Sequence, residues 1–111
     1  MKKEFILKNG YDFDRIIKNN KSYRYENYII YIEYTTDDSY HFGISVGKKI
    51  GNAVTRNKVK RQLRNIISKK HYKNGFNCII IVRKGILLKT YDEMNIDYNN
   101  AIEKLNILKE D

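Results

Sequence analysis

Residues 44–64 read ISVGKKIGNAVTRNKVKRQLR and join three kinds of segment within a short span. The first three residues, 44–46, are the end of the segment 41–46, whose alternating pattern predicts a strand. Residues 47–55 contain two glycines and an asparagine, which favour a loop whose backbone can adopt positive φ angles. After the loop, apolar side chains recur at helical spacing. The stretch therefore predicts a strand, a loop and an amphipathic helix, capped by either Asn52 or Thr55.

The segments before this stretch predict a helix and a small sheet. Residues 11–19 have apolar side chains at helical spacing, which predicts a short helix. Residues 22–34 are rich in Tyr and Ile, and the pair Glu26 and Asn27 can divide them into two strands. Polar residues 35–40 predict the turn that leads into the next strand, which gives an antiparallel meander.

The segments after it predict one more strand and one more helix. Residues 78–82 form a short β-branched run, as expected of a central strand that is covered on both faces. Thr90 and Glu93 match a capping box, and an apolar helical stripe continues as far as Leu108. The order α-β-β-β-α-β-α predicts an α+β domain with a mainly antiparallel four-stranded sheet and three helices.

Length and composition favour one folded domain over residues 1–111, since 111 residues suffice for a single core. The single cysteine, Cys78, excludes an internal disulfide and fits a reducing compartment. No run is long enough for a signal peptide or a bilayer span. We therefore expect a cytoplasmic protein without a membrane partner.

The net charge of +9 comes from one internal window. Residues 48–73 carry ten Lys or Arg and no Asp or Glu, whereas residues 1–47 carry seven of each sign. Residues 74–111 carry five basic and six acidic side chains. A charge concentrated in this way is typical of a protein that binds a polyanion, so the expected partner is nucleic acid.

The predicted central helix has a basic side. Arg56, Lys60 and Arg64 recur at four-residue spacing, apart from an apolar stripe that includes Val59 and Leu63. A solvated helix face is the alternative explanation, but such faces usually mix charges of both signs. The absence of acidic residues therefore favours contact with RNA phosphates.

The ten Tyr and four Phe are a second indication of RNA binding, because aromatic rings can stack on unpaired bases. For most of them a place in the core is the simpler explanation. Tyr31 shares one strand face with Ile29 and Glu33, while Tyr28 and its alternate neighbours take the other face. The sequence leaves open which face is exposed.

The sequence contains no recognisable catalytic or metal-binding cluster. Asp12 and Asp14 fall at non-adjacent positions of a predicted helix, and Asp37 and Asp38 fall in a predicted turn. The two histidines, His41 and His71, are thirty residues apart. Cys78 lies in an apolar strand, which indicates a core residue. We therefore expect no catalytic residue, no metal ligand and no cofactor held by the protein alone.

Residues 44–64 closely resemble the signature region of the bacterial ribonuclease P protein. The family's Arg-Asn-Arg motif is present as Arg56-Asn57-Lys58, in which Lys keeps the charge but loses the bidentate fork. Flanking segments resemble the family in the same order, namely Leu7-Lys8 with Asp12-Phe13, residues 28–34 and residues 79–85.

The resemblance implies a fold and a function. The fold would be that shared with domain 2 of ribosomal protein S5, with a left-handed crossover around the basic helix. The protein would bind the catalytic RNA subunit and precursor tRNA in ribonuclease P, without an obligate protein partner, while Mg²⁺ would be held mainly by RNA.

The same resemblance implies two sets of site residues. The expected RNA-binding residues are Lys48, Lys49, Asn52, Arg56, Asn57, Lys58, Lys60, Arg61 and Arg64. The expected cleft for the 5′ leader of precursor tRNA is lined by Phe13, Ile17, Tyr31, Ser45, Lys60 and Arg64.

Two other functions remain open at this point. A structural RNA-binding protein, such as a ribosomal one, would have a similar composition. A nuclease that works without an RNA subunit is the second alternative, and the lack of a carboxylate cluster argues against it.

Overall fold

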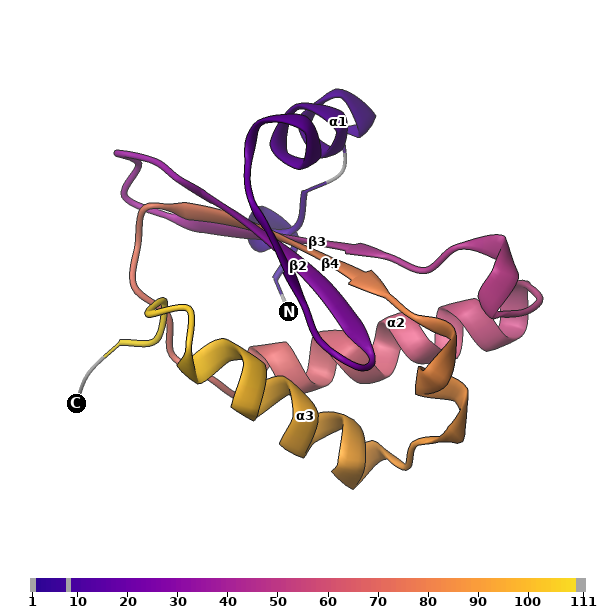
Figure 1. Cartoon of the computed structure of the whole chain (residues 1–111). Helices are drawn as coiled ribbons and strands as arrows, with labels where there is room; N and C mark the ends of the chain where they lie inside the picture. Colours follow the sequence, from indigo (N-terminus) through magenta and orange to yellow (C-terminus); the bar gives the residue numbers. More distant parts are fainter. Residues whose placement is uncertain (1, 8, 110–111) are drawn as a thin grey trace.

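The structure, a computed structural model, describes residues 2–7 and 9–109 (Figure 1). Lys8, which the family resemblance includes, lies outside the described residues. In chain order the α-helices, β-strands and short 3₁₀ helices (η) are η1 (Lys3–Phe5), α1 (Gly10–Asn19), β1 (Ser22–Arg24), β2 (Tyr28–Tyr34), β3 (Tyr40–Ser45), η2 (Lys48–Ile50), α2 (Ala53–Ser68), β4 (Phe76–Val82), η3 (Lys84–Leu88) and α3 (Tyr91–Glu103).

Helix α2 begins earlier than the sequence pattern predicts. The Asn52 side chain accepts a hydrogen bond from the backbone N–H of Thr55 at 2.9 Å, so Asn52 is the cap and Thr55 lies inside the helix. The predicted loop is therefore shorter by three residues. Gly51 precedes the cap with a φ angle of 157°, where a Cβ would press on the Thr55 side chain.

Helix α3 has the predicted start but an earlier end. Thr90 and Glu93 form the reciprocal capping box. The prediction that the helical stripe continues through Leu108 is wrong, because the helix ends at Glu103. Asn106 takes a left-handed φ angle of 55°, and Leu108 then pairs with Tyr72 in an antiparallel bridge.

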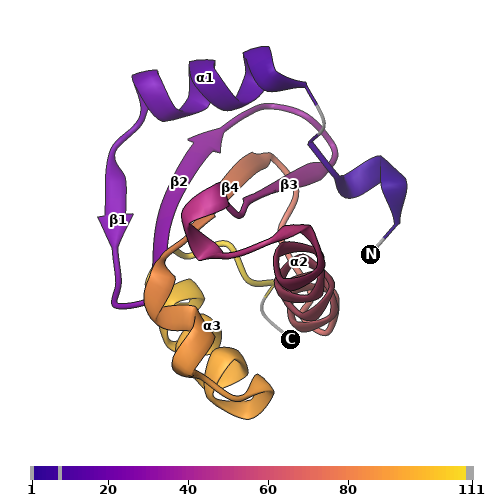
Figure 2. The ribbon, with the colours of Figure 1, turned by 90° about the vertical axis from the view of Figure 1, so that its right-hand side faces the viewer.

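The four strands form one mixed sheet in the order β1-β2-β4-β3. The β1–β2 and β2–β4 pairs are antiparallel, which confirms a mainly antiparallel sheet, and β3 pairs with β4 in parallel. The predicted meander is wrong, because β4 lies between β2 and β3. Helix α2 connects the two parallel strands. In Figure 2 both strands run toward the reader and the chain passes clockwise from β3 through α2 to β4, so the crossover is left-handed.

The helices cover the sheet unequally. Helix α1 lies over one face, whereas α2 and α3 lie side by side on the other (Figures 1 and 2). The second face holds the main core, in which Tyr28, Ile30, Ile80 and Val82 are buried. Burial of these side chains supplies the chief driving force for folding.

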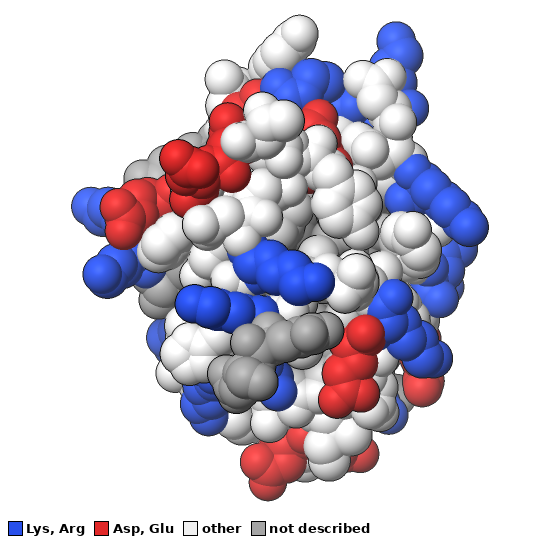
Figure 3. Space-filling model, turned by 90° about the vertical axis from the view of Figure 1, so that its left-hand side faces the viewer, with Lys and Arg blue, Asp and Glu red and all other residues white. Residues whose placement is uncertain are grey.

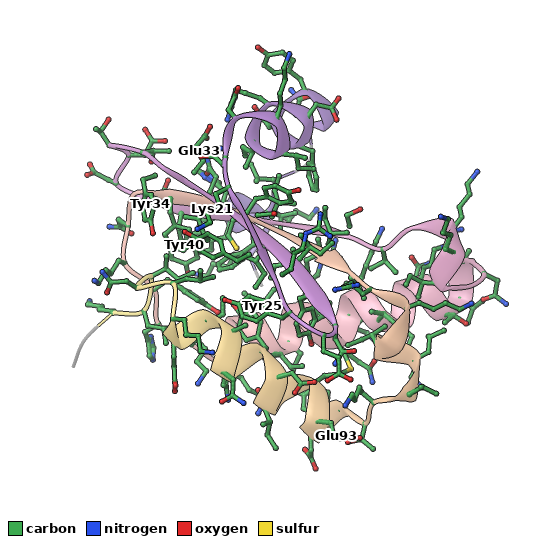
Figure 4. All side chains as sticks on the ribbon, viewed as in Figure 1. Lys21, Tyr25, Glu33, Tyr34, Tyr40 and Glu93 are labelled. Carbon is green, nitrogen blue, oxygen red and sulfur yellow. The ribbon has the colours of Figure 1, made fainter. Side chains whose placement is uncertain are left out.

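Several tyrosines attach the sheet and the turn before β2 to α3 and to the turn after it. The hydroxyls of Tyr25, Tyr28 and Tyr34 donate to backbone oxygens of Ala101, Met94 and Leu105 at 3.2–3.4 Å. Figure 4 shows Tyr25 and Tyr34 on the side of the sheet that carries α3. These residues confirm that much of the tyrosine content serves packing.

A buried pair of hydroxyls joins α3 to the segment after α2. The Tyr72 hydroxyl donates to the Ile67 oxygen at 2.8 Å, so it accepts from the Tyr98 hydroxyl, which lies 2.7 Å away. Burial raises the pKa of both phenols above the ordinary range, which keeps them protonated as donors.

Removing the two hydroxyls separately should have unequal effects. Tyr98→Phe leaves Tyr72 bonded to Ile67 and should lower the free energy of unfolding by about 1 kcal/mol. Tyr72→Phe leaves the Tyr98 donor buried and unpaired, which should cost about 1–3 kcal/mol. Urea unfolding measures both values, and a greater loss in Tyr98→Phe would contradict this order of donation.

Candidate nucleic-acid interface

The face of the sheet under α1 consists of three rows of side chains that run across the strands. The register places each row, because directly paired residues point to the same side. The three rows are Glu33-Asn77-His41, Ser22-Tyr31-Ile79-Gly43 and Arg24-Ile29-Ile81-Ser45.

The first row is polar and holds α1 in place. Arg15 of α1 donates to both carboxylate oxygens of Glu33, at 2.8 and 3.2 Å, and also pairs with Asp12 at 2.8 Å. Asn77 donates to Glu33 at 2.9 Å, and its amide oxygen accepts from His41 Nδ1 at 2.9 Å. Figure 4 shows Glu33 below α1. Because the Arg15 contact is bidentate, it fixes orientation as well as distance.

The carboxylate of Glu33 stays charged in this position. Burial alone would raise the pKa of Glu33, but hydrogen bonds from Arg15 and Asn77 and the positive charge of Arg15 lower it below the ordinary value. The ion pair is thus a structural contact between α1 and the sheet.

The middle row lies under α1. A Cβ atom at Gly43 would overlap the Phe13 ring, so glycine allows Phe13 to approach the strand backbone. Ile16 of α1 is fully buried, whereas Phe13, Ile17 and Tyr31 are half-buried. The structure brings these last three residues to the same side of the sheet (Figure 2).

The third row is the least covered. Ile29, Ile81 and Ser45 are half-buried and Arg24 is exposed, whereas their neighbours on the opposite face are mostly buried. Ser45 was predicted from the sequence as a site residue, whereas Arg24, Ile29 and Ile81 were not. Only strand order could have identified these three residues, since they come from three separate strands.

Helix α2 presents Arg56, Lys60 and Arg64 away from α3, whereas Lys58 lines a pocket with Ile86 of η3 and Met94 of α3. Val59, Leu63, Ile66 and Ile67 are buried beneath the sheet. The flank toward α3 is defined by two contacts: the Lys69 ammonium lies 5.1 Å from the centre of the Tyr91 ring, and Tyr91 hydrogen-bonds to Asn65. Helical spacing places Arg56, Lys60 and Arg64 on the other flank, beside edge strand β3.

The other expected RNA-binding residues lie along the same helix and the loop before it. Lys48 and Lys49 are exposed in η2, and Asn52 is the exposed cap of α2. Asn57, Lys58 and Arg61 are exposed on the helix.

The expected leader residues fall on two sides of the sheet. Phe13, Ile17, Tyr31 and Ser45 belong to the α1 face, whereas Lys60 and Arg64 belong to a helix that packs on the opposite face (Figure 2). Edge strand β3 lies between the two groups. An RNA strand that touched both groups would have to pass around this edge.

The end of the molecule that lies away from the start of α2 has a different charge distribution from α2. Figure 3 shows that end with acidic and basic side chains intermixed. In contrast, α2 carries five Lys or Arg and no Asp or Glu. The positive field is thus concentrated along α2.

Metal-ligating side chains do not cluster among the described residues. Within residues 2–7 and 9–109, no three His, Cys, Asp or Glu side chains are grouped closely enough to hold a metal ion. Burial raises the pKa of the Cys78 thiol, which therefore stays protonated. None of the described helices is long and apolar enough to cross a membrane.

The family model for Ribonuclease P matches residues 1–106. The chain belongs to the ribonuclease P protein family. A ribonuclease P protein component from Streptococcus pyogenes serotype M5 (strain Manfredo) is 37% identical over 110 residues, which are 98% of this chain and 92% of the relative. The family predicted from residues 44–64 is confirmed.

Solved ribonuclease P proteins share the fold. The Staphylococcus aureus RNase P protein has a TM-score of 0.85 and 29% identity, with coverage of 95% of this chain and 98% of that one. The Thermotoga maritima protein has a TM-score of 0.80 and 27% identity, with coverage of 88% and 94%. The predicted ribonuclease P protein fold is therefore confirmed.

The contact between α1 and the sheet should depend on pH. A carboxylate whose pKa is lowered by folding stabilises the protein above its unfolded pKa, about 4.3 for Glu, and this contribution is lost as pH falls through the folded pKa. At pH 7 the Glu33→Gln variant should therefore unfold at a lower urea concentration than the unaltered protein. The difference between their two unfolding midpoints should narrow below about pH 4. An equal gap at pH 7 and pH 3 would contradict this role.

Proposed function

We propose that this chain is the protein subunit of the ribonuclease P ribonucleoprotein, which removes the 5′ leader from precursor tRNA. The observation that carries the proposal is the presence of two different surfaces on either side of β3. One is the cationic flank of α2, and the other is the half-buried row across the sheet under α1.

The cationic surface suits the catalytic RNA. Arg56, Lys58 and Arg61 would meet phosphates of the RNA subunit, with Lys48 and Lys49 extending the contact. Such contacts release counterions and screen repulsion between two large RNAs. The binding energy gained from phosphate contacts does not depend on the base sequence of the RNA, which suits a protein that binds a structured RNA.

The α1 face suits a single strand. Phe13, Ile17 and Tyr31 provide apolar and aromatic surface, and Ser45 provides a hydroxyl beside them. Unpaired bases can stack on such surfaces without sequence preference. A leader of variable sequence would therefore be held here.

Lys60 and Arg64 would connect the two surfaces. They lie one helical turn apart on the flank of α2 beside β3, where a strand leaving the α1 face would pass. We assign them to the phosphates of the substrate near this edge.

In this proposal the protein makes no catalytic contact. RNA-bound Mg²⁺ would perform the cleavage, and the protein would strengthen binding of the substrate and of the metal by lowering phosphate repulsion. The complex would work in the cytoplasm without an obligate protein partner.

Loss of the two linking charges should weaken the protein's assistance to cleavage. Lys60→Ala/Arg64→Ala should slow cleavage of precursor tRNA by the catalytic RNA at low Mg²⁺ by about tenfold or more, since two charged contacts of roughly 1 kcal/mol each are lost. Lys104→Ala/Lys109→Ala removes the same charge from exposed positions outside α2 and is the matched control. Initial rates with and without protein provide the measurement.

The outcomes separate the three functions considered. Rescue of low-Mg²⁺ cleavage by the unaltered chain and its loss only in the α2 variant would support the subunit. Binding of RNA without rescue would instead support a structural RNA-binding protein. Cleavage by the chain and Mg²⁺ without RNA would support a protein nuclease.

The exposed Arg24 should contribute to leader binding. Arg24→Ala should weaken binding of precursor tRNA by about 3- to 10-fold and reduce the salt slope of log affinity by about 0.7, the value for one phosphate contact on a single strand. Binding of mature tRNA, which has no leader, should not change. Filter binding over a range of salt concentrations tests this, and an equal loss with both tRNAs would place Arg24 elsewhere.

A further inference from the structure

A groove of about 520 Å³ lies between η1, β3 and α2, outside both surfaces described above. Its volume is in the range of small-ligand pockets. Its lining residues are Lys2, Phe5, Tyr40, Ile67, Ser68 and Tyr72.

One wall of the groove is a column of aromatic rings. Phe5 stacks on Tyr40 with ring centres 4.5 Å apart and planes at 10°, and Tyr40 stacks on Phe76 at 5.4 Å and 8°. Phe76 is buried, whereas Phe5 and Tyr40 are only half-buried. The column therefore begins in the core and ends at the groove with a ring that remains accessible.

The sheet edge holds Phe5 in this position. The N–H of Leu7 donates to the Phe42 oxygen at 2.8 Å, and Ile6 forms a parallel bridge with Phe42. The segment that carries Phe5 is thus paired with β3.

The rim of the groove is cationic. Lys2 lines it directly, and Ser68 follows Arg64 by one helical turn and Lys60 by two on the same flank of α2. Glu4, the acidic residue of η1, lines a different pocket with His41 and Asn77. No acidic side chain is among the described residues that line the groove.

We propose that this groove binds one unpaired nucleobase of an RNA whose backbone follows the basic flank of α2. The base would extend the Phe5–Tyr40–Phe76 column, and its phosphates would face Lys2 at the rim of the groove. An aromatic ring next to cationic side chains is the combination that single-stranded RNA binding requires. The inference rests on the proposed function, because it needs RNA along α2.

An unpaired base fits this site better than a paired one. In a duplex both faces of a base are covered by its neighbours, so only an extruded or single-stranded base can offer a face to Phe5. The groove would thus select RNA that has an unpaired nucleotide beside the backbone contacts.

The test replaces the accessible ring without removing its apolar volume. Phe5→Leu should weaken binding of the ribonuclease P catalytic RNA, and of a short single-stranded RNA, by about 5- to 100-fold, the range for loss of one stacked base. Phe5→Tyr keeps the ring and should bind as the unaltered chain does. Leu88→Ala, at an 87% exposed apolar residue in η3, is the control. Thermal unfolding confirms that each variant is folded.

Salt dependence and fluorescence distinguish stacking from charge. Phe5→Leu should leave the slope of log affinity against log salt unchanged, whereas Lys2→Ala, which removes the cation that lines the groove, should make it less steep. The chain contains no Trp, so Phe5→Trp introduces a single reporter whose emission should change with single-stranded RNA and not with a duplex.

The possible failures point to different conclusions. Equal affinity of Phe5→Leu and the unaltered chain, with strong RNA binding in both, would overturn the base pocket and leave the proposed function intact. Failure of the unaltered chain to bind the catalytic RNA would overturn both.

Discussion

The rest of the structure depends on the pairing of β4 with two strands of opposite direction. β4 is antiparallel to β2 and parallel to β3, and its side chains are buried on both faces except Ile81. A parallel neighbour requires a crossover, and here the crossover is α2. The strand that completes the sheet therefore also fixes the basic helix beside the β3 edge.

This arrangement separates two kinds of chemistry that both suit RNA. The α1 face is partly apolar, and Arg15 and Glu33 hold the helix over one end of it while the row from Arg24 to Ser45 stays less covered. The charged side chains of α2 lie on the other side of β3, and Arg61 and Arg64 among them are exposed to water. Stacking and phosphate attraction can then act on different parts of one RNA assembly.

The sequence predicted the elements well because their signals are local. The capping residues of α3, the β-branched run of β4 and the charge window around α2 each depend on neighbours in the chain. The rows on the α1 face could not be predicted, because Arg24, Ile29 and Ile81 meet only through strand order and register. The left-handed crossover came from family resemblance alone, since parallel connections are nearly always right-handed. The end of α3 was missed because apolar spacing continues past the left-handed Asn106.

Site-directed cross-linking tests most directly whether the two surfaces meet different RNAs. The native Cys78 is buried, so Ser45→Cys on the α1 face or Asn57→Cys on α2 supplies the accessible thiol for a photoreactive group. In a complex of the protein, the catalytic RNA and precursor tRNA, the account predicts that position 45 labels the 5′ leader and position 57 labels the catalytic RNA. Labelling of the leader from position 57 but not from position 45 would contradict it.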